Sequence, residues 1–331
     1  MGTLYIDKHA ELVRLRGATL VIGRPGARCA SIPLHLVERV VIQGDVSLTS
    51  SVIAGIASAG ASVVLLSGRH GRRAAFVHGR LHNDASTRIA QYRCYLDVKW
   101  RTRWAARIVT AKIRGHLVFL REKLGARPDR RRALTRAVEH LVSAIATLRE
   151  AQTGDALSLD AIRGVEGAAS RVVFEALAAL LPAETGFRGR NRRPPRDPVN
   201  ACLSLSYTLA HYDAVRVACV AGLDPYIGFY HDLSYGRESL ACDLVELVRP
   251  AIDRFVCRLF NEQELRARDF SMDAGGCFMK KSARERFYPL YETFAQHPRR
   301  LMRRAARLLV RRIVAHEVED ETGLDDDVPV A

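Results

Sequence analysis

The sequence predicts an α+β protein, in which a small β-rich, β-sandwich-like domain is followed by a larger all-α domain that carries a metal site. Up to about residue 82, short aliphatic and β-branched runs alternate with turn residues at roughly ten-residue spacing. From residue 85 onward, apolar residues recur at helical spacing almost throughout. A histidine followed closely by two carboxylates lies within the helical part. These three observations define the predicted architecture.

The first domain is expected to span residues 1–82. Its short apolar runs are bounded by Gly and Ser, which favour turns. The run at 62–66 is continuously apolar, which is typical of a buried strand. We expect a short helix at 50–59 and strands at 4–7, 11–15, 19–22, 40–44 and 62–66.

The second domain is expected to span residues 83–316 and to end in an acidic tail at 317–331. Seven carboxylates and no Lys or Arg lie in that tail, so we expect it to be solvated and disordered. A cationic loop with several arginines and prolines interrupts the helical pattern at 184–198. Helices are expected at 86–125, 131–152, 158–182, 199–221, 239–262 and 283–316.

The composition points to a polyanionic partner. The net charge is +15, and basic proteins bind nucleic acid by releasing the counterions of the phosphates. Only six of the 51 basic residues are lysine, and a GC-rich genome would also produce such an arginine excess. Charge alone therefore leaves a nucleic-acid partner and a solvated basic surface equally open.

Other features exclude several classes of protein. The seven cysteines are scattered and never spaced as CxxC, which argues against a disulfide framework and structural zinc. The chain has no apolar run of about 18 residues and no signal-peptide pattern at its start. We expect a cytoplasmic protein that does not interact with a membrane.

The segment at 224–246 contains the strongest candidate site. Asp243 and Glu246 are spaced i, i+3 and so lie on one face of the predicted helix, for which Ser239 is a suitable N-cap. His231 lies in the turn before this helix. Carboxylates with an imidazole are ligands that suit Mn²⁺ or Mg²⁺. A solvated acidic helix edge and a structural histidine are the alternatives.

Further candidates lie elsewhere in the helical part. Glu166 is flanked by Gly and Ala in a helix, so that a ligand or another backbone can approach it, although an exposed helical Glu is the default. A row of arginines at 299–312 would either bind phosphate or be solvated. The proposed phosphate contacts, which would position DNA without reading its sequence, are Arg188, Arg190, Arg192, Arg193, Arg237, Lys280 and Lys281.

At these residues the chain resembles the family of CRISPR-associated integrases that insert new spacers into CRISPR arrays. The resemblance covers nearly the whole chain, and the linked motifs occur in the family's order. Tyr230 and Cys242 depart from the usual residues, but neither removes a ligand. The motifs are VVIQG at 40–44, RGVEG at 163–167, DPVNA at 197–201, GLDPYIGF at 222–229, GRESLACDLVE at 236–246, RP at 249–250 and GGCF at 275–278.

The resemblance implies the identity of the metal ligands and of the partners. The ligands of Mn²⁺ or Mg²⁺ would be Glu166, His231 and Glu246, with Asp243 as a further acid at the site. The N-terminal β-domain would form a homodimer, and a small ferredoxin-like partner protein would bridge two dimers. The DNA partners would be the spacer precursor and the CRISPR repeat.

The expected reaction is phosphoryl transfer, in which a 3′-hydroxyl of spacer DNA attacks a phosphodiester at the end of a CRISPR repeat. With water as the nucleophile, the same site would act as an endonuclease. Asp243 would hold a water, orient His231 or help with a second ion, and these roles remain open. Two other functions also remain open, a non-catalytic scaffold that binds nucleic acid and a metal-dependent phosphohydrolase of a small substrate.

Overall fold

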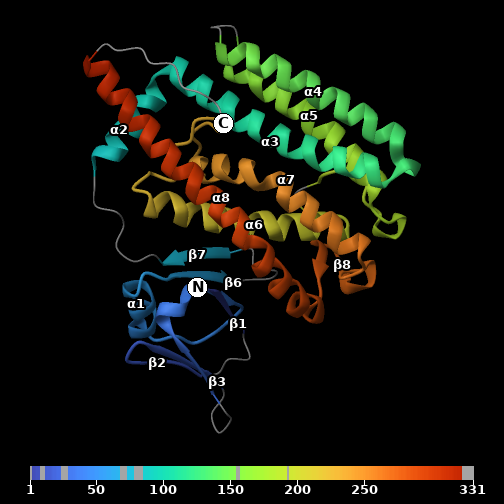
Figure 1. Cartoon of the computed structure of the whole chain (residues 1–331). Helices are drawn as coiled ribbons and strands as arrows, with labels where there is room; N and C mark the ends of the chain where they lie inside the picture. The colour runs from blue at the N-terminus through green and yellow to red at the C-terminus, as the bar shows by residue number, and fades with distance from the viewer. Residues whose placement is uncertain are drawn as a thin grey trace. The chain divides into compact units, whose positions relative to one another are not determined.

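The computed structural model describes residues 2–7, 12–23, 29–67, 73–77, 85–153, 157–191 and 194–322. Its contacts divide the chain into two compact units, Met1–Asn83 and Asp84–Ala331. The first unit is built mainly of strands and the second mainly of helices, each around its own hydrophobic core (Figure 1). The predicted α+β fold class is therefore confirmed. No helix within the described ranges is both long enough and apolar enough to cross a bilayer.

The first unit contains two sheets. In the first sheet, β1 (Gly2–Asp7), β5 (Val37–Gln43) and β6 (Ser62–Ser67) run parallel, and β7 (Arg73–Val77) pairs with β6 in the antiparallel sense. In the second sheet, β2 (Leu12–Arg16), β3 (Thr19–Gly23) and β4 (Ala30–Pro33) form an antiparallel meander. A 3₁₀ turn at Leu34–Leu36 leads from β4 into β5.

One apolar core joins both sheets and the helix α1 (Ser50–Ser58). Val40 and Val63 of the first sheet, Leu20 of the second and Ile56 of α1 are all fully buried in it. The continuous apolar run of β5 is typical of a parallel strand that is covered on both faces. Strands β4 and β7 were not predicted. The four residues of β4 show no continuous apolar run, and the short apolar run of β7 at 74–77 was not recognised as a strand.

The second unit is a bundle around α7 (Ser239–Asn261), which packs against α3, α6 and α8. Its apolar face is buried along the whole length of the helix. The other helices are α2 (Ser86–Leu96), α3 (Val98–Ala126), α4 (Arg131–Thr153), α5 (Leu159–Leu180), α6 (Pro198–Val220) and α8 (Lys281–Thr322), with 3₁₀ turns at Pro128–Arg130, Ala183–Thr185 and Ala267–Asp269.

The helical unit departs from the sequence prediction at several points. The helix expected at 86–125 is broken at Asp97, whose carboxylate caps α3 by accepting hydrogen bonds from the backbone N–H groups of Lys99 and Trp100. A hairpin of β8 (Phe270–Asp273) and β9 (Gly276–Met279) was not expected. Helix α8 continues to Thr322, so the first residues of the acidic tail are helical. Residues 323–331 lie outside the described ranges.

The buried Arg299 of α8 forms an ion pair with Asp213 of α6. Arg299 Nε donates to Asp213 Oδ2 over 2.9 Å, and its two terminal nitrogens donate to the Glu292 carboxylate over 2.7 and 3.0 Å. The guanidinium and both carboxylates are largely removed from water. Breaking a buried ion pair on one side is costly, because the other charge stays buried without compensation.

We therefore expect Arg299→Met to lower the stability of the protein by about 3–5 kcal/mol, since two buried carboxylates would lose their common cation. The measurement is urea unfolding followed by circular dichroism. Arg300→Met, which changes the exposed neighbour on the same helix, should leave the midpoint unchanged. Equal midpoints for the two variants would show that the buried arginine contributes nothing to stability.

A second polar contact ties α6 to the start of α7. His211 Nε2 lies 3.3 Å from Glu238 Oε2. Burial alone would lower the pKa of His211, but hydrogen bonds with Cys242 and Glu238 outweigh it and raise this pKa to about 9. The same contact lowers the pKa of Glu238. At neutral pH, His211 is therefore a cation paired with Glu238.

This pair predicts a pH dependence of stability. Because the pKa of His211 is higher in the folded chain than its ordinary value of 6.5, its contribution is complete below pH 6.5 and is lost as the pH rises through about 9. We expect His211→Gln to cost on the order of 2 kcal/mol at pH 6 and much less at pH 10. Thermal unfolding at a series of pH values measures the difference, with the exposed His140→Gln as control. A pH-independent difference would contradict the assignment.

Candidate metal centre

The candidate site is built around a tight turn at residues 224–231 that leads toward α7. Gly228 allows this turn to lie directly on the first residues of the helix, because a Cβ atom there would come within 2.6 Å of the backbone carbon of Ser239. Leu240 N donates to Pro225 O over 2.9 Å. Ser239, predicted as the N-cap, is the first helical residue instead, and its hydroxyl donates to Asp232 O. The turn and the helix therefore form one unit.

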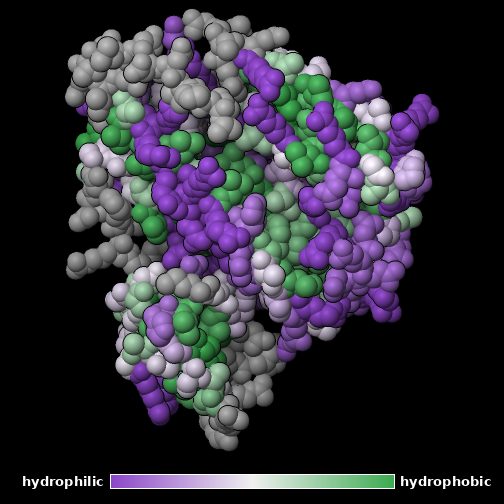
Figure 2. All heavy atoms as spheres, viewed as in Figure 1, coloured by the Kyte–Doolittle hydropathy of each residue, from purple (hydrophilic) through white to green (hydrophobic). Residues whose placement is uncertain are grey.

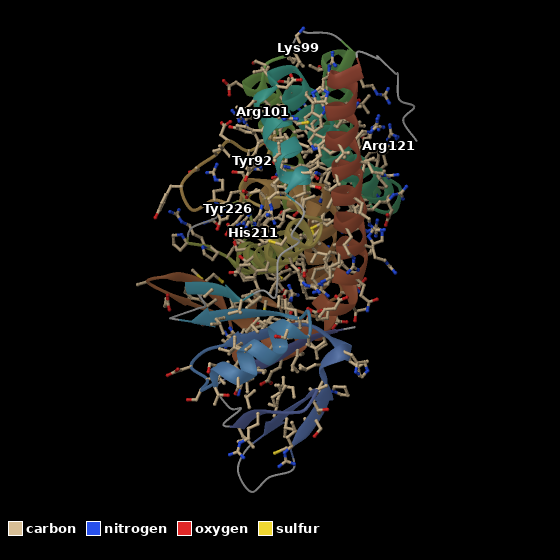
Figure 3. All side chains as sticks on the ribbon, turned by 90° about the vertical axis from the view of Figure 1, so that its left-hand side faces the viewer. Tyr92, Lys99, Arg101, Arg121, His211 and Tyr226 are labelled. Carbon is tan, nitrogen blue, oxygen red and sulfur yellow. The ribbon has the colours of Figure 1, made fainter. Side chains whose placement is uncertain are left out.

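Side chains from α2 hold the start of the turn. The buried Gln91 donates through Nε2 to Ile227 O over 2.7 Å and to Asp224 O over 3.0 Å, and its Oε1 accepts from Asp224 N. Tyr92 donates its hydroxyl to Asp224 Oδ2 over 2.8 Å. Figure 3 shows Tyr92 and Tyr226 one below the other along the helical unit. An amide that satisfies three backbone groups fixes the path of the turn.

Two arginines hold the other end of the turn. Arg101 of α3, also labelled in Figure 3, donates through Nε to Phe229 O over 3.0 Å, and Arg163 of α5 donates to Tyr230 O over 3.1 Å. Both guanidinium groups also lie 2.7 Å from the carboxylate of Asp232. Asp232 is more than half exposed, so its main effect is to hold the arginines on the turn.

Asp243 is fully buried and organises the histidine. Its Oδ2 accepts from the backbone N–H groups of Phe229 and Tyr230 over 2.6 and 3.0 Å. Its Oδ1 accepts from the backbone N–H and from Nδ1 of His231 over 3.0 and 2.8 Å. With the carboxylate accepting from Nδ1, the neutral imidazole carries its lone pair on Nε2. Of the three roles considered for Asp243, this geometry supports the orientation of His231.

The free nitrogen of His231 faces the carboxylates. His231 Nε2 lies 3.9 Å from Glu246 Oε1. The carboxylate of Glu166 on α5 lies close to that of Glu246, because both contact the ammonium of Lys112 on α3. Lys112 Nζ is 2.7 Å from Glu246 Oε2. Ser170 Oγ, one turn further along α5, donates to Glu166 Oε1 over 2.6 Å. The structure thus brings together the residues expected at the metal site from three separate segments.

The charges around these carboxylates keep them ionised. Burial would raise the pKa of Glu246, but Arg249 and Lys112 outweigh it and lower this pKa to about 2. For Glu166, burial and the nearby Glu246 oppose ionisation, whereas Lys112 and Ser170 favour it, and the pKa is lowered. Both groups are therefore anionic at neutral pH and able to act as ligands.

A second layer of buried polar residues continues behind Glu246. Arg249 Nε lies 3.2 Å from Glu246 Oε1, and its guanidinium stacks over the ring of Tyr207 at 5.0 Å. Tyr207 donates its hydroxyl to Asp253, whose other oxygen lies 2.9 Å from Nε2 of His116. Burial and the charge of Asp253 raise the pKa of Tyr207 well above its ordinary value. Glu246 therefore rests on a rigid polar network.

The donor set fits a hard divalent cation, with two carboxylates and one imidazole. Glu246 Oε2 is buried and accepts no hydrogen bond of acceptable geometry among the described residues; the Lys112 ammonium is its close ionic contact. No three His, Cys, Asp or Glu side chains within those residues are already spaced to coordinate one ion. The carboxylates instead converge on Lys112, a cation of the protein itself.

The residues predicted to bind nucleic acid have different environments. Arg188 and Arg237 are exposed, and Arg192 and Arg193 lie outside the described residues. Arg190 is turned inward, where it donates to Asn200 Oδ1 and Ser204 Oγ and stacks on Tyr207. Its prediction as a DNA contact is therefore less well supported than that of Arg188. The exposed Lys280 donates to Arg268 O, and the exposed Lys281 lies 3.8 Å from Glu285.

Sequence reasoning missed four residues that build the site: Gln91, Arg101, Lys112 and Arg163. Lys112 was detectable, since it stands among apolar residues in the helical stretch IVTAKI at 108–113 of a chain with few lysines. Arg163 lies inside a motif that was noted only for its glutamate. Gln91 and Arg101 carry no such signal, because their partners are backbone groups more than a hundred residues away.

The comparisons with known proteins agree on one family. The family model described as CRISPR associated protein Cas1 matches residues 4–293. A CRISPR-associated endonuclease Cas1 of Thermodesulfovibrio yellowstonii is 39% identical over 95% of this chain and 98% of its own length. The structure of a CAS1 protein from Thermotoga maritima has a TM-score of 0.79 at 20% identity, covering 95% of this chain and 97% of that one.

A casposase bound to its integration product also has the same fold, with a TM-score of 0.75 at 18% identity over 94% of this chain and 91% of that one. The family model spans most of the chain, and the similarity to the Thermodesulfovibrio protein extends over nearly the full length of both sequences. This chain belongs to the family of CRISPR-associated Cas1 proteins.

Proposed function

We propose that this chain is a divalent-metal-dependent DNA endonuclease and integrase of CRISPR adaptation, which joins the 3′-hydroxyl ends of spacer DNA to the CRISPR repeat by transesterification. The observation that carries the proposal is the convergence of Glu166, His231 and Glu246, with Asp243 behind the imidazole. Membership of a family whose named relatives are endonucleases supports nucleic acid as the substrate. The likeness to a casposase supports a fold compatible with strand joining.

The residues of the site have separate tasks in this reaction. Mn²⁺ or Mg²⁺ held by Glu166, His231 and Glu246 would neutralise charge that develops on the phosphodiester and activate the attacking hydroxyl. Asp243 keeps the lone pair of His231 Nε2 directed at the site. Arg249 and the network behind it hold the Glu246 carboxylate in place. Because one phosphodiester replaces another, no nucleotide cofactor is required.

The surface of α8 provides a second element of the proposal, a path for DNA. Arg300, Arg304, Arg307 and Arg311 are all exposed and follow each other at helical spacing, so they form one stripe, here called the α8 arginine stripe. Figure 2 shows hydrophilic residues gathered along the middle of this helix. Among the described side chains, no carboxylate forms an ion pair with these four arginines.

Further arginines of α3 and α8 add to this positive charge. Burial first, and then the charges of Arg312 and Arg103, lower the pKa of Arg107. Such a pKa shift indicates arginines close enough to repel one another, a repulsion that phosphate groups would relieve. The α8 arginine stripe and this cluster are proposed to hold the DNA backbone. The DNA would be the spacer precursor and the CRISPR repeat.

The assembly proposed for this reaction follows from the family resemblance. The N-terminal β-rich unit would form a homodimer, and a small ferredoxin-like partner would bridge two such dimers. Two sites would then act on the two ends of one spacer. The exposed cations Arg188, Arg237, Lys280 and Lys281 remain proposed DNA contacts in this assembly, as do Arg190, Arg192 and Arg193.

The proposal is tested with a branched DNA that mimics a half-integrated spacer, given to the purified protein with Mn²⁺ or Mg²⁺. We expect the wild type to rejoin the strands and release the flap. Glu246→Gln and His231→Asn should each lower the rate by about 10³-fold or more, because each removes a ligand from the group that stabilises the transition state. Chelation with EDTA should have the same effect.

The exposed Glu262→Gln at the end of the same helix is the matched control, and its rate should equal that of the wild type. Tight binding of the branch without any strand exchange, with either metal, would favour a non-catalytic scaffold. Strand exchange that persists in Glu246→Gln would show that the chemistry takes place elsewhere.

The role of the α8 arginine stripe predicts a change in the salt dependence of DNA binding. Replacing Arg304, Arg307 and Arg311 together by Gln should reduce the slope of log K against log salt by about 2–3, as expected when that many phosphate contacts are lost. Fluorescence anisotropy with duplex DNA at several salt concentrations measures this slope.

The control removes the same charge from the exposed start of α4, with Gln replacing Arg131, Arg132 and Arg136. An equal loss of slope in both triple variants would mean that net charge alone drives binding. A slope close to zero in the wild type would instead favour a small phosphorylated substrate.

A further inference from the structure

The cation that lies between the two candidate metal ligands belongs to the protein itself. Lys112 is buried to 2% exposure, contacts Glu166 Oε1 and lies 2.7 Å from Glu246 Oε2. We propose that Lys112 is a resident counter-ion of the site, which a divalent metal ion must displace, and that it thereby sets the affinity of the site for metal. This inference rests on the proposed function, since it assumes that Glu166 and Glu246 are metal ligands.

The contacts of the carboxylate oxygens show why Lys112 and a metal ion compete. Glu246 Oε1 faces Arg249 and His231, so its other oxygen, Oε2, is the one turned to Lys112. That buried oxygen accepts no hydrogen bond of acceptable geometry among the described residues. A metal ion held by Glu166, Glu246 and His231 would therefore compete with the ammonium for the same two carboxylates. Two cations at hydrogen-bonding distance repel each other strongly in a buried site.

Helix α3 packs closely against α7 near Lys112, so we expect the displacement to occur in the lysine side chain. Gly115, nearly one turn further along α3, lies so close to Pro250 of α7 that a Cβ atom there would approach Pro250 Cγ to 2.8 Å. Helix α3 therefore cannot move closer to α7 at this level. The lysine side chain has four rotatable bonds and a compact charge, which allow the ammonium to swing away while the helices stay in place.

Lys112 also explains how the site is assembled before metal binds. Two carboxylates brought together in a buried place repel each other, and without a cation one of them takes up a proton. The Lys112 ammonium contacts both carboxylates and so offsets their mutual repulsion. The site is therefore preorganised for metal, but part of the binding free energy is spent on removing the lysine.

The test measures metal binding directly, by electron paramagnetic resonance of free Mn²⁺ in titrations of the full chain without DNA. Lys112→Met keeps the length of the side chain and removes its charge. We expect its Kd for Mn²⁺ to be about tenfold lower than that of the wild type, or lower still, since one competing ion pair is removed. Mn²⁺ should also raise the Tm of Lys112→Met more than that of the wild type.

Two further variants control for charge and for folding. Lys123→Met removes the same charge from the same helix at a distance from the site, and should bind Mn²⁺ as the wild type does. Lys112→Arg keeps the counter-charge and can bridge both carboxylates, so it should fold even if Lys112→Met does not. Its guanidinium is harder to displace, and we expect it to bind Mn²⁺ more weakly than the wild type.

The outcomes separate this inference from the proposed function. If Lys112→Met binds Mn²⁺ no more tightly than the wild type, or if Lys112→Arg binds it more tightly, the inference is overturned and the metal site stands. If neither the wild type nor Lys112→Met binds Mn²⁺, both the inference and the metal-dependent mechanism fail. Tighter binding in Lys112→Met alone, with weaker binding in Lys112→Arg, supports the competition.

Discussion

The burial of the Glu246 carboxylate is the constraint on which the rest of the helical unit depends. A carboxylate removed from water must be matched by positive charge and fixed dipoles, or it takes up a proton. Here Arg249 lies on one side of it and Lys112 on the other. Arg249 in turn rests on Tyr207, which is held by Asp253 and thus linked to His116. The buried carboxylate of Glu246 is therefore linked, directly or through other polar residues, to side chains on α3, α6 and α7.

The second requirement is that His231 directs its Nε2 toward the carboxylate of Glu246. Asp243 meets it by accepting four hydrogen bonds from three consecutive residues of the turn. Gln91, Arg101 and Arg163 then bind the carbonyl groups of the same turn from three other helices. Such a turn has little freedom to adapt, which suits a site where ligands must be held in position before the reaction. Hydrogen bonds from the surrounding helices therefore fix the conformation of the turn.

The fold and the candidate ligands could be predicted from the sequence to different degrees. The helical periodicity predicted most helices to within two residues, because their apolar faces are long and regular. The edge strand β4 and the short hairpin β8–β9 lack such periodicity and were missed. Glu166, His231, Asp243 and Glu246 were found because they lie in linked motifs. Gln91 was not, since its partners lie in a distant turn that no local pattern reveals. Lys112 could have been noticed as a lysine among apolar residues, but the local sequence does not show that its partners are Glu166 and Glu246.

The most direct test of the central claim, that Glu166, His231 and Glu246 hold a metal ion, is pulsed electron paramagnetic resonance of the protein loaded with Mn²⁺. A nitrogen bound directly to the ion produces a characteristic ¹⁴N modulation. The account predicts this modulation in the wild type and its disappearance in His231→Asn, while Mn²⁺ remains bound through the carboxylates. A ¹⁴N modulation that persists in His231→Asn, or a wild-type spectrum with water ligands alone, would contradict it.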